Sequence, residues 1–364
     1  MTAPATAGAA PAKRGCFARL LRLFGCLFLL GLLAAGAVAG WGWRELHRPQ
    51  SGPRGGGSAL FVVSPGESAG GILRRLEGEG RIGPALLARA WLRWARGAPH
   101  LKAGEYELPA GMSTIEILGK LERGEIRTIA VTLVEGLDVD ESAAALAAAG
   151  LGDAARLRAE FANPGRIADL DAAAAHLEGY LFPDTYRFAP GTSEREIADT
   201  LVATFRRQFD SRVRPLRAAG DSRPLRELVI LASLVEKEAK LDAERPLIAA
   251  VYANRLRLAI GLYADPTIIH ALKLLGRWNG NLTKSDLRME SPWNTYRVAG
   301  LPPGPICSPG LASLQAAARP ADVSYIYFVS RNDGSHVFAD SLAEHNRNVE
   351  RWQKRPWRAR AAGR

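Results

Sequence analysis

The part of this sequence best suited to acid–base chemistry is an apolar segment that ends in two glutamates. Residues 228–239 read LVILASLVEKEA, so an uncharged run is followed directly by Glu236 and Glu238. A carboxyl group at the end of a buried helix loses hydration, which raises its pKa and keeps it protonated near neutral pH. Protonation is the state that a general acid requires. The segment therefore indicates a candidate acid on an apolar helix.

The two glutamates lie on different faces of such a helix and cannot act together across one bond. Two residues of separation place Glu236 and Glu238 about 200° apart around the helix axis. Glu238 follows the bulkier apolar stripe of Leu231, Leu234 and Val235, which favours it as the buried member. The preference is small because the helix is apolar nearly all round. Two solvated glutamates at a helix end would give the same pattern.

Other common kinds of site find no match in the sequence. Phosphate-binding and dinucleotide motifs are absent, because the glycine pair at Gly70 lacks the later glycines and the lysine. The six histidines show neither HExxH nor i, i+4 spacing, and carboxylates do not cluster with them. We therefore expect no metal and no cofactor. Cys307 is expected to be a small buried residue, and as the one cysteine of the body it leaves no internal disulfide there.

Helices and a hairpin surround the acidic helix in an order that indicates an α+β domain. Helices are expected at 193–210, 225–239 and 243–259. A further helix begins at Asp265-Pro266, with Asp265 as its N-cap and not as an acid. Residues 325–338 have the alternation and turn residues of a β-hairpin. Because no β-α-β alternation occurs, an α+β class is predicted.

A long uncharged stretch precedes all of these elements. Residues 23–43 carry no charge and would span about 31 Å as an α-helix, enough to cross a bilayer. Basic residues within 13–22 favour a cytoplasmic N-terminus, and Trp41 and Trp43 lie where an interfacial aromatic belt would be. We expect a membrane anchor with the body on the extracytoplasmic side. A cleaved signal peptide ending near Ala39 is the alternative, which the bulky tryptophans disfavour.

The distribution of charge argues against nucleic-acid binding. The sequence has 48 Lys and Arg against 37 Asp and Glu, a formal net charge of +11. Residues 1–58 hold seven basic residues and one acidic residue, and residues 351–364 hold six basic residues and no acidic one. The body between these ends is therefore nearly neutral. A neutral body lacks the basic surface that phosphate backbones require, so no nucleic-acid partner is expected.

An internal repeat follows the anchor. Residues 61–77 and 106–122 share six identities and one aromatic exchange at an offset of 45 residues, and a degenerate third copy surrounds Gly136. Each copy predicts a short strand, a glycine turn, a serine N-cap and an amphipathic helix. Residues 61–68 resemble the opening of LysM domains, small βααβ modules that bind N-acetylglucosamine polymers. Any strand–turn–helix unit needs the same glycine and serine, so carbohydrate binding stays open at this point.

A series of short motifs extends through the rest of the chain. In chain order they occupy 180–186, 232–238, 244–245, 251–256, 265–267, 294–296, 300–306, 308–310, 327–329 and 345–346. Together with the anchor, these motifs resemble the membrane-anchored endolytic murein transglycosylases, the YceG-like family. The resemblance runs from the anchor to about Gln353. It implies that the catalytic glutamate of the family is Glu238, the second glutamate of the Glu-Lys-Glu run.

The resemblance implies a lyase that cleaves the β-1,4 bond between MurNAc and GlcNAc in nascent glycan strands. One carboxyl group suffices, because the nucleophile is the C6 hydroxyl of MurNAc and the product carries a 1,6-anhydro ring. Most glycosidases need a second carboxylate instead. Asn294, Thr295 and Tyr296 are the expected substrate contacts, since amide, hydroxyl and aromatic groups suit a sugar chain. Trp293 stands where the family usually has tyrosine.

The expected organisation has six segments along the chain. They are a basic cytoplasmic N-terminus at 1–22, a transmembrane helix at 23–43, a flexible linker at 44–58, a LysM-like repeat domain at 59–135, a catalytic α+β domain at 136–353 and a basic tail at 354–364. The expected location is the cytoplasmic (inner) membrane, as a single-pass protein with its body outside. Peptidoglycan strands are the expected substrate, and peptidoglycan synthases are candidate partners.

Two other functions stay open at this stage. One is a non-catalytic, membrane-tethered scaffold that binds peptidoglycan, and the glutamate on an apolar helix argues against it. The other is a soluble lyase acting on a small aromatic metabolite. The expected anchor and exported body argue against that lyase, because such metabolites are cytoplasmic.

Overall fold

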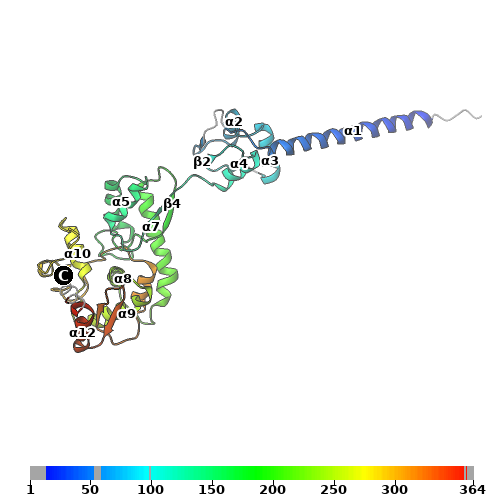
Figure 1. The fold of residues 1–364 in the computed structure, drawn as a ribbon. Coiled ribbons are helices and arrows are strands. Elements are labelled where there is room, and N and C mark those ends of the chain that lie inside the picture. The colour runs from blue at the N-terminus through cyan, green and yellow to red at the C-terminus, as the bar shows by residue number, and fades with distance from the viewer. Residues whose placement is uncertain (1–13, 53–58, 98–99, 356–357, 359–364) are drawn as a thin grey trace, which may run out of the picture. The chain divides into compact units, whose positions relative to one another are not determined.

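The computed structural model describes residues 14–52, 59–97, 100–355 and 358 (Figure 1). The chain divides into two units, unit 1 at residues 1–127 and unit 2 at residues 128–364. The division falls somewhat before the expected boundary at 135, because the third strand–turn–helix copy packs in unit 2 and not with the first two copies.

Unit 1 consists of a long helix followed by a small two-stranded domain. Its elements are α1 (Arg14–His47), β1 (Ala59–Val63), α2 (Ala69–Gly78), α3 (Ala85–Arg96), β2 (Gly104–Leu108) and α4 (Thr114–Arg123). β1 pairs antiparallel with β2, and Phe61 lies opposite Tyr106, its equivalent in the repeat. The first four elements of the domain follow the order strand–helix–helix–strand, and α4 comes after them. The likeness to LysM domains in particular stays a prediction.

The local signals of the repeat appear as predicted. Ser68 accepts a hydrogen bond from the Gly71 backbone at the start of α2, and Ser113 caps α4 in a capping box. Gly66 and Gly111 precede these caps with φ of +79° and +93°, a left-handed conformation that glycine adopts without strain. The two serines and two glycines therefore make equivalent turns into equivalent helices.

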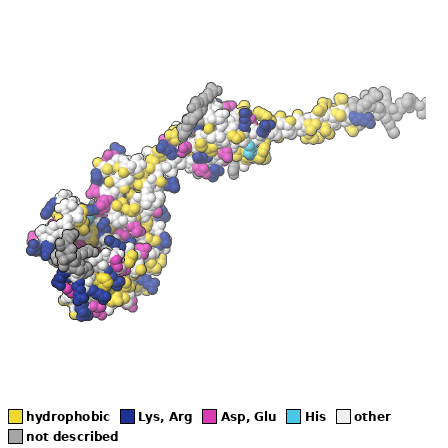
Figure 2. Space-filling view, viewed as in Figure 1, with side chains coloured by type: hydrophobic (Ala, Val, Ile, Leu, Met, Phe, Trp, Pro, Cys, Tyr) yellow, Lys and Arg dark blue, Asp and Glu magenta, His cyan; other side chains and the backbone are white. Residues whose placement is uncertain are grey.

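Helix α1 is long and apolar enough to cross a membrane over Leu21–His47, by length and composition. Figure 2 shows hydrophobic side chains exposed along this helix. The helix continues into the range predicted as a linker, and Leu46 is buried against the domain. Pro49 pairs with Ser113, and the Gln50 backbone N–H donates to the Met112 carbonyl at 3.0 Å. The described part of the predicted linker is thus helical or bonded to the domain; residues 53–58 lie outside the described residues.

Unit 2 is mainly helical in its described part, which also contains two separate strand pairs. Its helices are α5 (Val139–Ala148), α6 (Ala154–Phe161), α7 (Glu194–Gln208), α8 (Leu225–Glu238), α9 (Arg245–Arg257), α10 (Asp265–Leu274), α11 (Leu311–Ala318) and α12 (Leu342–Val349). Its strands are β3 (Ile129–Thr132) paired antiparallel with β4 (Thr185–Phe188), and β5 (Tyr327–Ser330) paired antiparallel with β6 (His336–Ala339). Mixed helices and antiparallel pairs confirm the α+β class.

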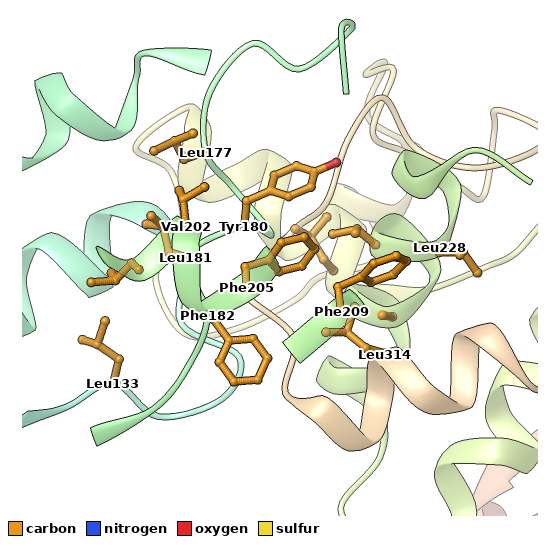
Figure 3. Close-up of a cluster of buried hydrophobic side chains, with 14 of the residues drawn as sticks. Leu133, Leu177, Tyr180, Leu181, Phe182, Val202, Phe205, Phe209, Leu228 and Leu314 are labelled. Atoms are coloured by element: carbon orange, nitrogen blue, oxygen red, sulfur yellow. The ribbon is translucent and has the colours of Figure 1, made fainter. Parts of the chain in front are cut away.

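Helix α8 runs through the core of unit 2. Every residue from Leu228 to Val235 is buried, so the apolar run is buried on all sides as its composition predicted. Figure 3 shows Leu228 in a cluster with Tyr180, Phe205 and Phe209, which come from a loop, from α7 and from the turn directly after α7. Fully burying one such side chain contributes roughly 1.5 to 3 kcal/mol. The core therefore fixes the helix that ends in the two glutamates.

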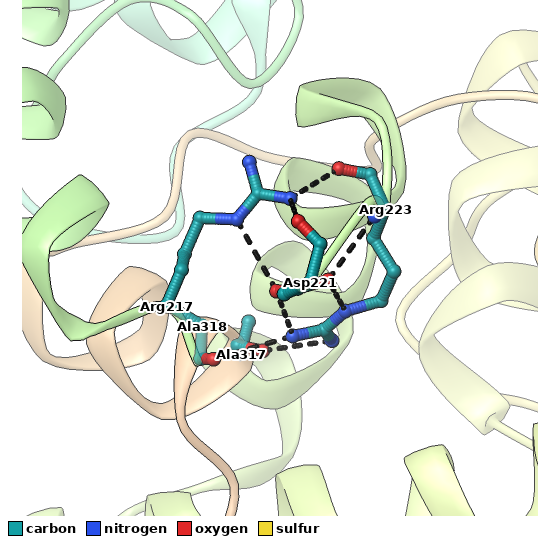
Figure 4. A network of polar contacts seen from close by, with 5 residues as sticks. All are labelled: Arg217, Asp221, Arg223, Ala317 and Ala318. Atoms are coloured by element: carbon teal, nitrogen blue, oxygen red, sulfur yellow. Dashed lines mark hydrogen bonds and ion pairs between the residues drawn. The ribbon is translucent and has the colours of Figure 1, made fainter. Parts of the chain in front are cut away.

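A charged cluster fastens the start of α8 to the rest of unit 2. Asp221 forms ion pairs with Arg217 at 3.2 Å and with Arg223 at 2.8 Å (Figure 4). The Arg223 guanidinium also donates to the carbonyls of Ala317 and Ala318 at the end of α11. The two guanidinium groups hold the pKa of Asp221 well below its usual range, and the hydrogen bonds from Arg223 are the larger cause. The loop before α8 is thereby tied to α11, which packs along α8.

Candidate active site

Glu238 is the last residue of α8 and lies where the buried helix meets the surface of unit 2. Its side chain is partly exposed, whereas the helix before it is buried. The Tyr252 hydroxyl, from the neighbouring helix α9, donates to Glu238 Oε1 at 3.3 Å. Tyr252 is itself only 1% exposed, so this hydroxyl reaches the carboxyl group from the core. One oxygen of the carboxyl group is therefore held by the protein.

The surroundings of Glu238 raise its pKa to about 7. Loss of hydration is the largest cause, and the negative charge of Asp265 adds to it. The hydrogen bond from Tyr252 and the positive charge of Arg255 act in the opposite direction. Near neutral pH both protonation states of Glu238 are thus accessible. A group with this property can donate a proton and later accept one.

Arg255 organises the aromatic residues beside the carboxyl group. Its guanidinium donates to the backbone carbonyls of Ile326 and Leu262 at 2.6 and 2.7 Å, so the hairpin and the loop before α10 are joined through it. The same group lies over the rings of Tyr263 and Tyr327, at 5.6 and 5.4 Å from their centroids. Arg255 therefore positions the tyrosine-rich wall of the site from α9.

Asp265 does not have the position that the sequence suggested. Ala264 is at the N-cap of α10, and Asp265 is the first helical residue, so the prediction of Asp265 as the N-cap was wrong. The physical reason is a partner distant in sequence: Asp265 Oδ1 accepts a hydrogen bond from the Tyr296 hydroxyl at 2.6 Å. The carboxylate is directed to this hydroxyl and not back onto its own helix. Asp265 thus belongs to the site, as a charge that acts on Glu238.

The three predicted substrate contacts fall into two groups. Asn294 is fully buried, its amide donates to the carbonyls of Leu287 and Met289, and its oxygen accepts from the Tyr296 backbone. Thr295 is 2% exposed and its hydroxyl accepts from the Ala264 backbone at 3.0 Å. These two side chains hold the loop in place, and their direct contact with sugar gains no support. Tyr296 is the member of the run that lies beside Asp265 and Glu238.

Tyr263 is a site residue that the sequence did not single out. Its ring lies 5.4 Å from that of Tyr296, centroid to centroid, and 49% of its surface is exposed. Its φ is +51°, which is uncommon for a residue with a side chain, and its N–H donates to the Thr295 carbonyl at 3.2 Å. The only sequence signal was an aromatic residue two positions before Asp265-Pro266. Tyr263 and Tyr296 together form a partly exposed aromatic surface.

Glu236 has a different environment from Glu238. Its side chain is 6% exposed and forms an ion pair with Arg245 at 2.9 Å. Its other oxygen accepts from the Gly310 backbone at 2.9 Å. Glu236 therefore joins α8, α9 and the loop before α11, and both of its oxygens are used by the protein. This arrangement is that of a structural residue, as the choice of Glu238 requires.

Glu178 is a second carboxyl group with a raised pKa. It is 2% exposed, and burial raises its pKa to about 8. Glu178 Oε2 accepts from the Val139 backbone at 3.1 Å, while Oε1 has no hydrogen-bond partner among the described residues. Because Glu178 is enclosed at the start of α5, it cannot reach a polymer at the surface. We assign it to the interior and not to the site.

The described residues contain no group of three or more His, Cys, Asp or Glu side chains that could hold a metal ion. His336 has a structural partner instead: its Nδ1 is 2.7 Å from Glu244 Oε2, and this pair links β6 to the turn directly before α9. Cys307 is fully buried, as the sequence indicated. The described groups around Glu238 are carboxyl, hydroxyl, guanidinium and aromatic side chains.

Comparison with known proteins places these residues in a broader context. The sequence profile of the YceG-like family matches residues 61–351. An endolytic murein transglycosylase of Bacillus subtilis (strain 168) is 34% identical over 275 residues, which cover 71% of this chain and 74% of that protein. An endolytic murein transglycosylase of Streptococcus pneumoniae (strain D39) is 29% identical over 358 residues, which cover 89% of this chain but 63% of that longer protein.

A solved structure agrees with this match. The crystal structure of a YceG-like protein from Listeria monocytogenes superposes with a TM-score of 0.54 at 29% sequence identity. The alignment covers 79% of this chain and 98% of that chain. The likeness therefore extends over nearly the whole of the solved protein, and it includes the mixed helix and strand architecture.

Proposed function

The chain belongs to the YceG-like family, and we propose that it is a lytic transglycosylase that cuts within peptidoglycan glycan strands by means of Glu238. The predicted enzyme class agrees with the names of its relatives, which are endolytic murein transglycosylases. The observation that carries the proposed mechanism is one carboxyl group, partly exposed, with a pKa of about 7 and a tyrosine hydroxyl on one oxygen.

In the proposed reaction, Glu238 acts first as an acid and then as a base. Neutral Glu238 protonates the oxygen that joins C1 of MurNAc to C4 of GlcNAc, and the bond from C1 to that oxygen breaks. The carboxylate then removes the proton from the C6 hydroxyl of the same MurNAc, and the C6 oxygen bonds to C1. Glu238 is neutral again, no water is consumed, and the product ends in 1,6-anhydroMurNAc. A pKa near 7 suits both steps.

The neighbours of Glu238 supply tuning and binding. Asp265, held by Tyr296, raises the proton affinity of Glu238, and Tyr252 stabilises the carboxylate that forms after the first step. Tyr263 and Tyr296 offer aromatic faces on which the apolar faces of sugar rings can pack. The buried hydrogen bonds of Asn294 and Thr295 keep Tyr263, Asp265 and Tyr296 in place.

We further propose a single-pass anchor at α1 in the cytoplasmic membrane, with the small domain of unit 1 and the whole of unit 2 on the extracytoplasmic side. The apolar length of α1 and the basic residues before it support this topology. The LysM-like βααβ domain of unit 1 would then hold glycan near the membrane, where strands are polymerised. Peptidoglycan synthases, which supply nascent strands there, are the partners that this placement suggests.

The mass of the reaction products tests the proposal. The full-length protein in detergent is incubated with purified peptidoglycan, and the released fragments are weighed. We expect 1,6-anhydroMurNAc ends, which are lighter by one water than reducing ends. Free reducing MurNAc would make the protein a hydrolase. Binding of glycan without any release, by both the wild type and Glu238→Gln, would favour the non-catalytic scaffold.

A further inference from the structure

Helix α3 of unit 1 exposes an apolar stripe that its own domain does not cover. Ala88 and Leu92 are fully buried and attach the helix to the small domain. Leu86, Ala90 and Trp94 recur every four residues on another face and are exposed, with Leu86 and Trp94 both at 82%. Two large apolar side chains at this exposure, one helical turn on either side of an alanine, form a continuous strip. Such a strip marks a contact surface.

The stripe lies beside the end of α1. The Leu87 side chain packs against Gly42, and the ring of Trp91 lies 6.1 Å from that of Trp43 in an edge-to-face arrangement. Leu87 and Trp91 occupy the side of α3 between the exposed stripe and α1. The stripe therefore begins where the apolar part of α1 ends, at the level of the tryptophans Trp41 and Trp43. Figure 2 shows hydrophobic side chains of α1 leading onto the adjoining part of the domain.

Positive charge borders the stripe on its other side. Arg89 and Arg93 are both exposed, one turn apart, and helix α3 contains no acidic residue. An exposed apolar stripe with tryptophan, flanked by arginines, is the pattern of a helix that lies in the headgroup region of a bilayer. Tryptophan rings settle at this depth, and arginines attract anionic lipid headgroups. The composition thus fits a lipid surface better than a polar protein partner.

We propose that α3 is a second membrane contact of this protein, lying along the outer surface of an anionic bilayer next to the point where α1 emerges. The proposal rests on the anchoring by α1 proposed above and is independent of the chemistry at Glu238. Its occupant is the lipid bilayer, because α1 brings the stripe to the membrane in every molecule. The consequence is that unit 1 has a fixed face toward the membrane instead of turning freely at the end of a tether.

Site-specific fluorescence on the full chain tests the contact. In a background of Cys16→Ser and Cys26→Ser, with the buried Cys307 retained, single cysteines replace Leu86, Trp94 or Val62, and each carries an environment-sensitive dye. Val62 on β1 is the matched control, an apolar residue that is 48% exposed. Each protein is reconstituted in vesicles of phosphatidylcholine and phosphatidylglycerol, with and without a quencher attached to the lipid tails.

We expect the dyes at positions 86 and 94 to shift to shorter wavelength and to be quenched by the lipid at least about twofold more than the dye at 62. Arg89→Glu with Arg93→Glu should reduce this quenching, and more so in vesicles rich in phosphatidylglycerol. Equal and weak quenching at all three positions would overturn the proposal. A shift to shorter wavelength without lipid quenching would also overturn it, because a second copy or another protein would then cover the stripe.

Cleavage of isolated glycan by the same variants separates this proposal from the function of the site. In detergent solution, the Leu86→Cys, Trp94→Cys and arginine variants should cut purified glycan at the wild-type rate, since unit 2 carries Glu238. If the dyes at positions 86 and 94 are not quenched by lipid in a protein that keeps Arg89 and Arg93 and still cleaves glycan, the membrane contact alone is contradicted. Loss of cleavage in the wild type would contradict the proposed function and leave the fluorescence result standing.

Discussion

The two sides of the C-terminal end of α8 carry the same side chain in opposite environments. On one side, Glu236 is surrounded by polar partners: the Arg245 guanidinium and the Gly310 backbone use both of its oxygens. On the other side, Glu238 has one hydroxyl partner, aromatic neighbours and the repelling charge of Asp265. Both residues are partly shielded from water. What differs is whether the protein supplies opposite charge and hydrogen bonds to the carboxylate form.

This contrast shows how one helix can carry a structural carboxyl group and the carboxyl group that we propose to be catalytic. A buried carboxyl group without a cationic partner keeps its proton near neutral pH, whereas a guanidinium partner stabilises the charged form. The separation of about 200° around the helix axis sends the two side chains to these different surroundings. Substitution of either glutamate tests this difference. Glu238→Gln should mainly lower activity, whereas Glu236→Gln should mainly lower stability.

The largest effect is expected from Glu238→Gln. Activity on peptidoglycan should fall by about 10³-fold or more, because the amide can neither donate the proton nor accept it back. The free energy of unfolding, in contrast, should increase in this variant at alkaline pH. Glu238 binds its proton more tightly in the folded protein, so wild-type stability decreases as pH rises from 4.5 to about 7. At pH 8 the variant should therefore be more stable than the wild type, by about 1 to 3 kcal/mol.

Product release and thermal unfolding at pH 5 and pH 8 check both parts. The stability difference between variant and wild type should be positive at pH 8 and several-fold smaller at pH 5. If Glu238→Gln retains a substantial part of the wild-type rate, the assignment of the acid is wrong. If it is less stable at pH 8, the carboxyl group is not the uncompensated charge described here.

The next largest effect is expected from the matched change on the other side, Glu236→Gln. This variant removes the buried carboxylate partner of Arg245 and leaves its guanidinium with the more exposed carboxylates of Asp242 and Glu135, which should cost about 1 to 3 kcal/mol of unfolding free energy in unit 2. Turnover per folded molecule should stay within a few-fold of the wild type. Urea unfolding, with activity normalised to the folded fraction, measures both quantities. A stable but inactive Glu236→Gln protein would reverse the roles of the two glutamates.

Smaller, opposite effects are expected from the two neighbours that tune Glu238. Asp265→Asn removes a negative charge, so the pKa of Glu238 should fall. The decline of activity at alkaline pH should then begin at a lower pH than in the wild type. Tyr252→Phe removes a hydrogen bond to the carboxylate, so the pKa should rise and activity should persist to higher pH. Each shift should be about half to one pH unit. The pH dependence of kcat/KM measures them, and shifts in the same direction would contradict the account.

The sequence predicted the elements whose causes are local. The apolar run before Glu236 predicted the buried helix α8, and Ser68 and Ser113 predicted caps for α2 and α4. Each of these depends on neighbours within a few residues. The hairpin at β5 and β6 was found for the same reason, since strand alternation and a short turn lie together in the sequence.

The features that the sequence did not predict depend on contacts between distant segments. Asp265 was interpreted as a cap because its partner, Tyr296, is 31 residues away in the sequence. Tyr263 gained its role from the ring of Tyr296 and from a backbone bond to Thr295, and neither leaves a periodic signal. The end of α1 was expected to lead into a free linker, because glycine content does not reveal that Pro49 pairs with Ser113.

The protonation state of Glu238 itself is the most direct test of the account. Glutamate side chains labelled with ¹³C at the carboxyl carbon report titration in the NMR spectrum, and the signal missing from Glu238→Gln assigns the group. That assignment also separates it from Glu178, whose pKa is raised to about 8. We predict that the Glu238 signal titrates at about pH 7 in the wild type and at a lower pH in Asp265→Asn. Titration of Glu238 near its ordinary value of 4.5 would contradict the central claim.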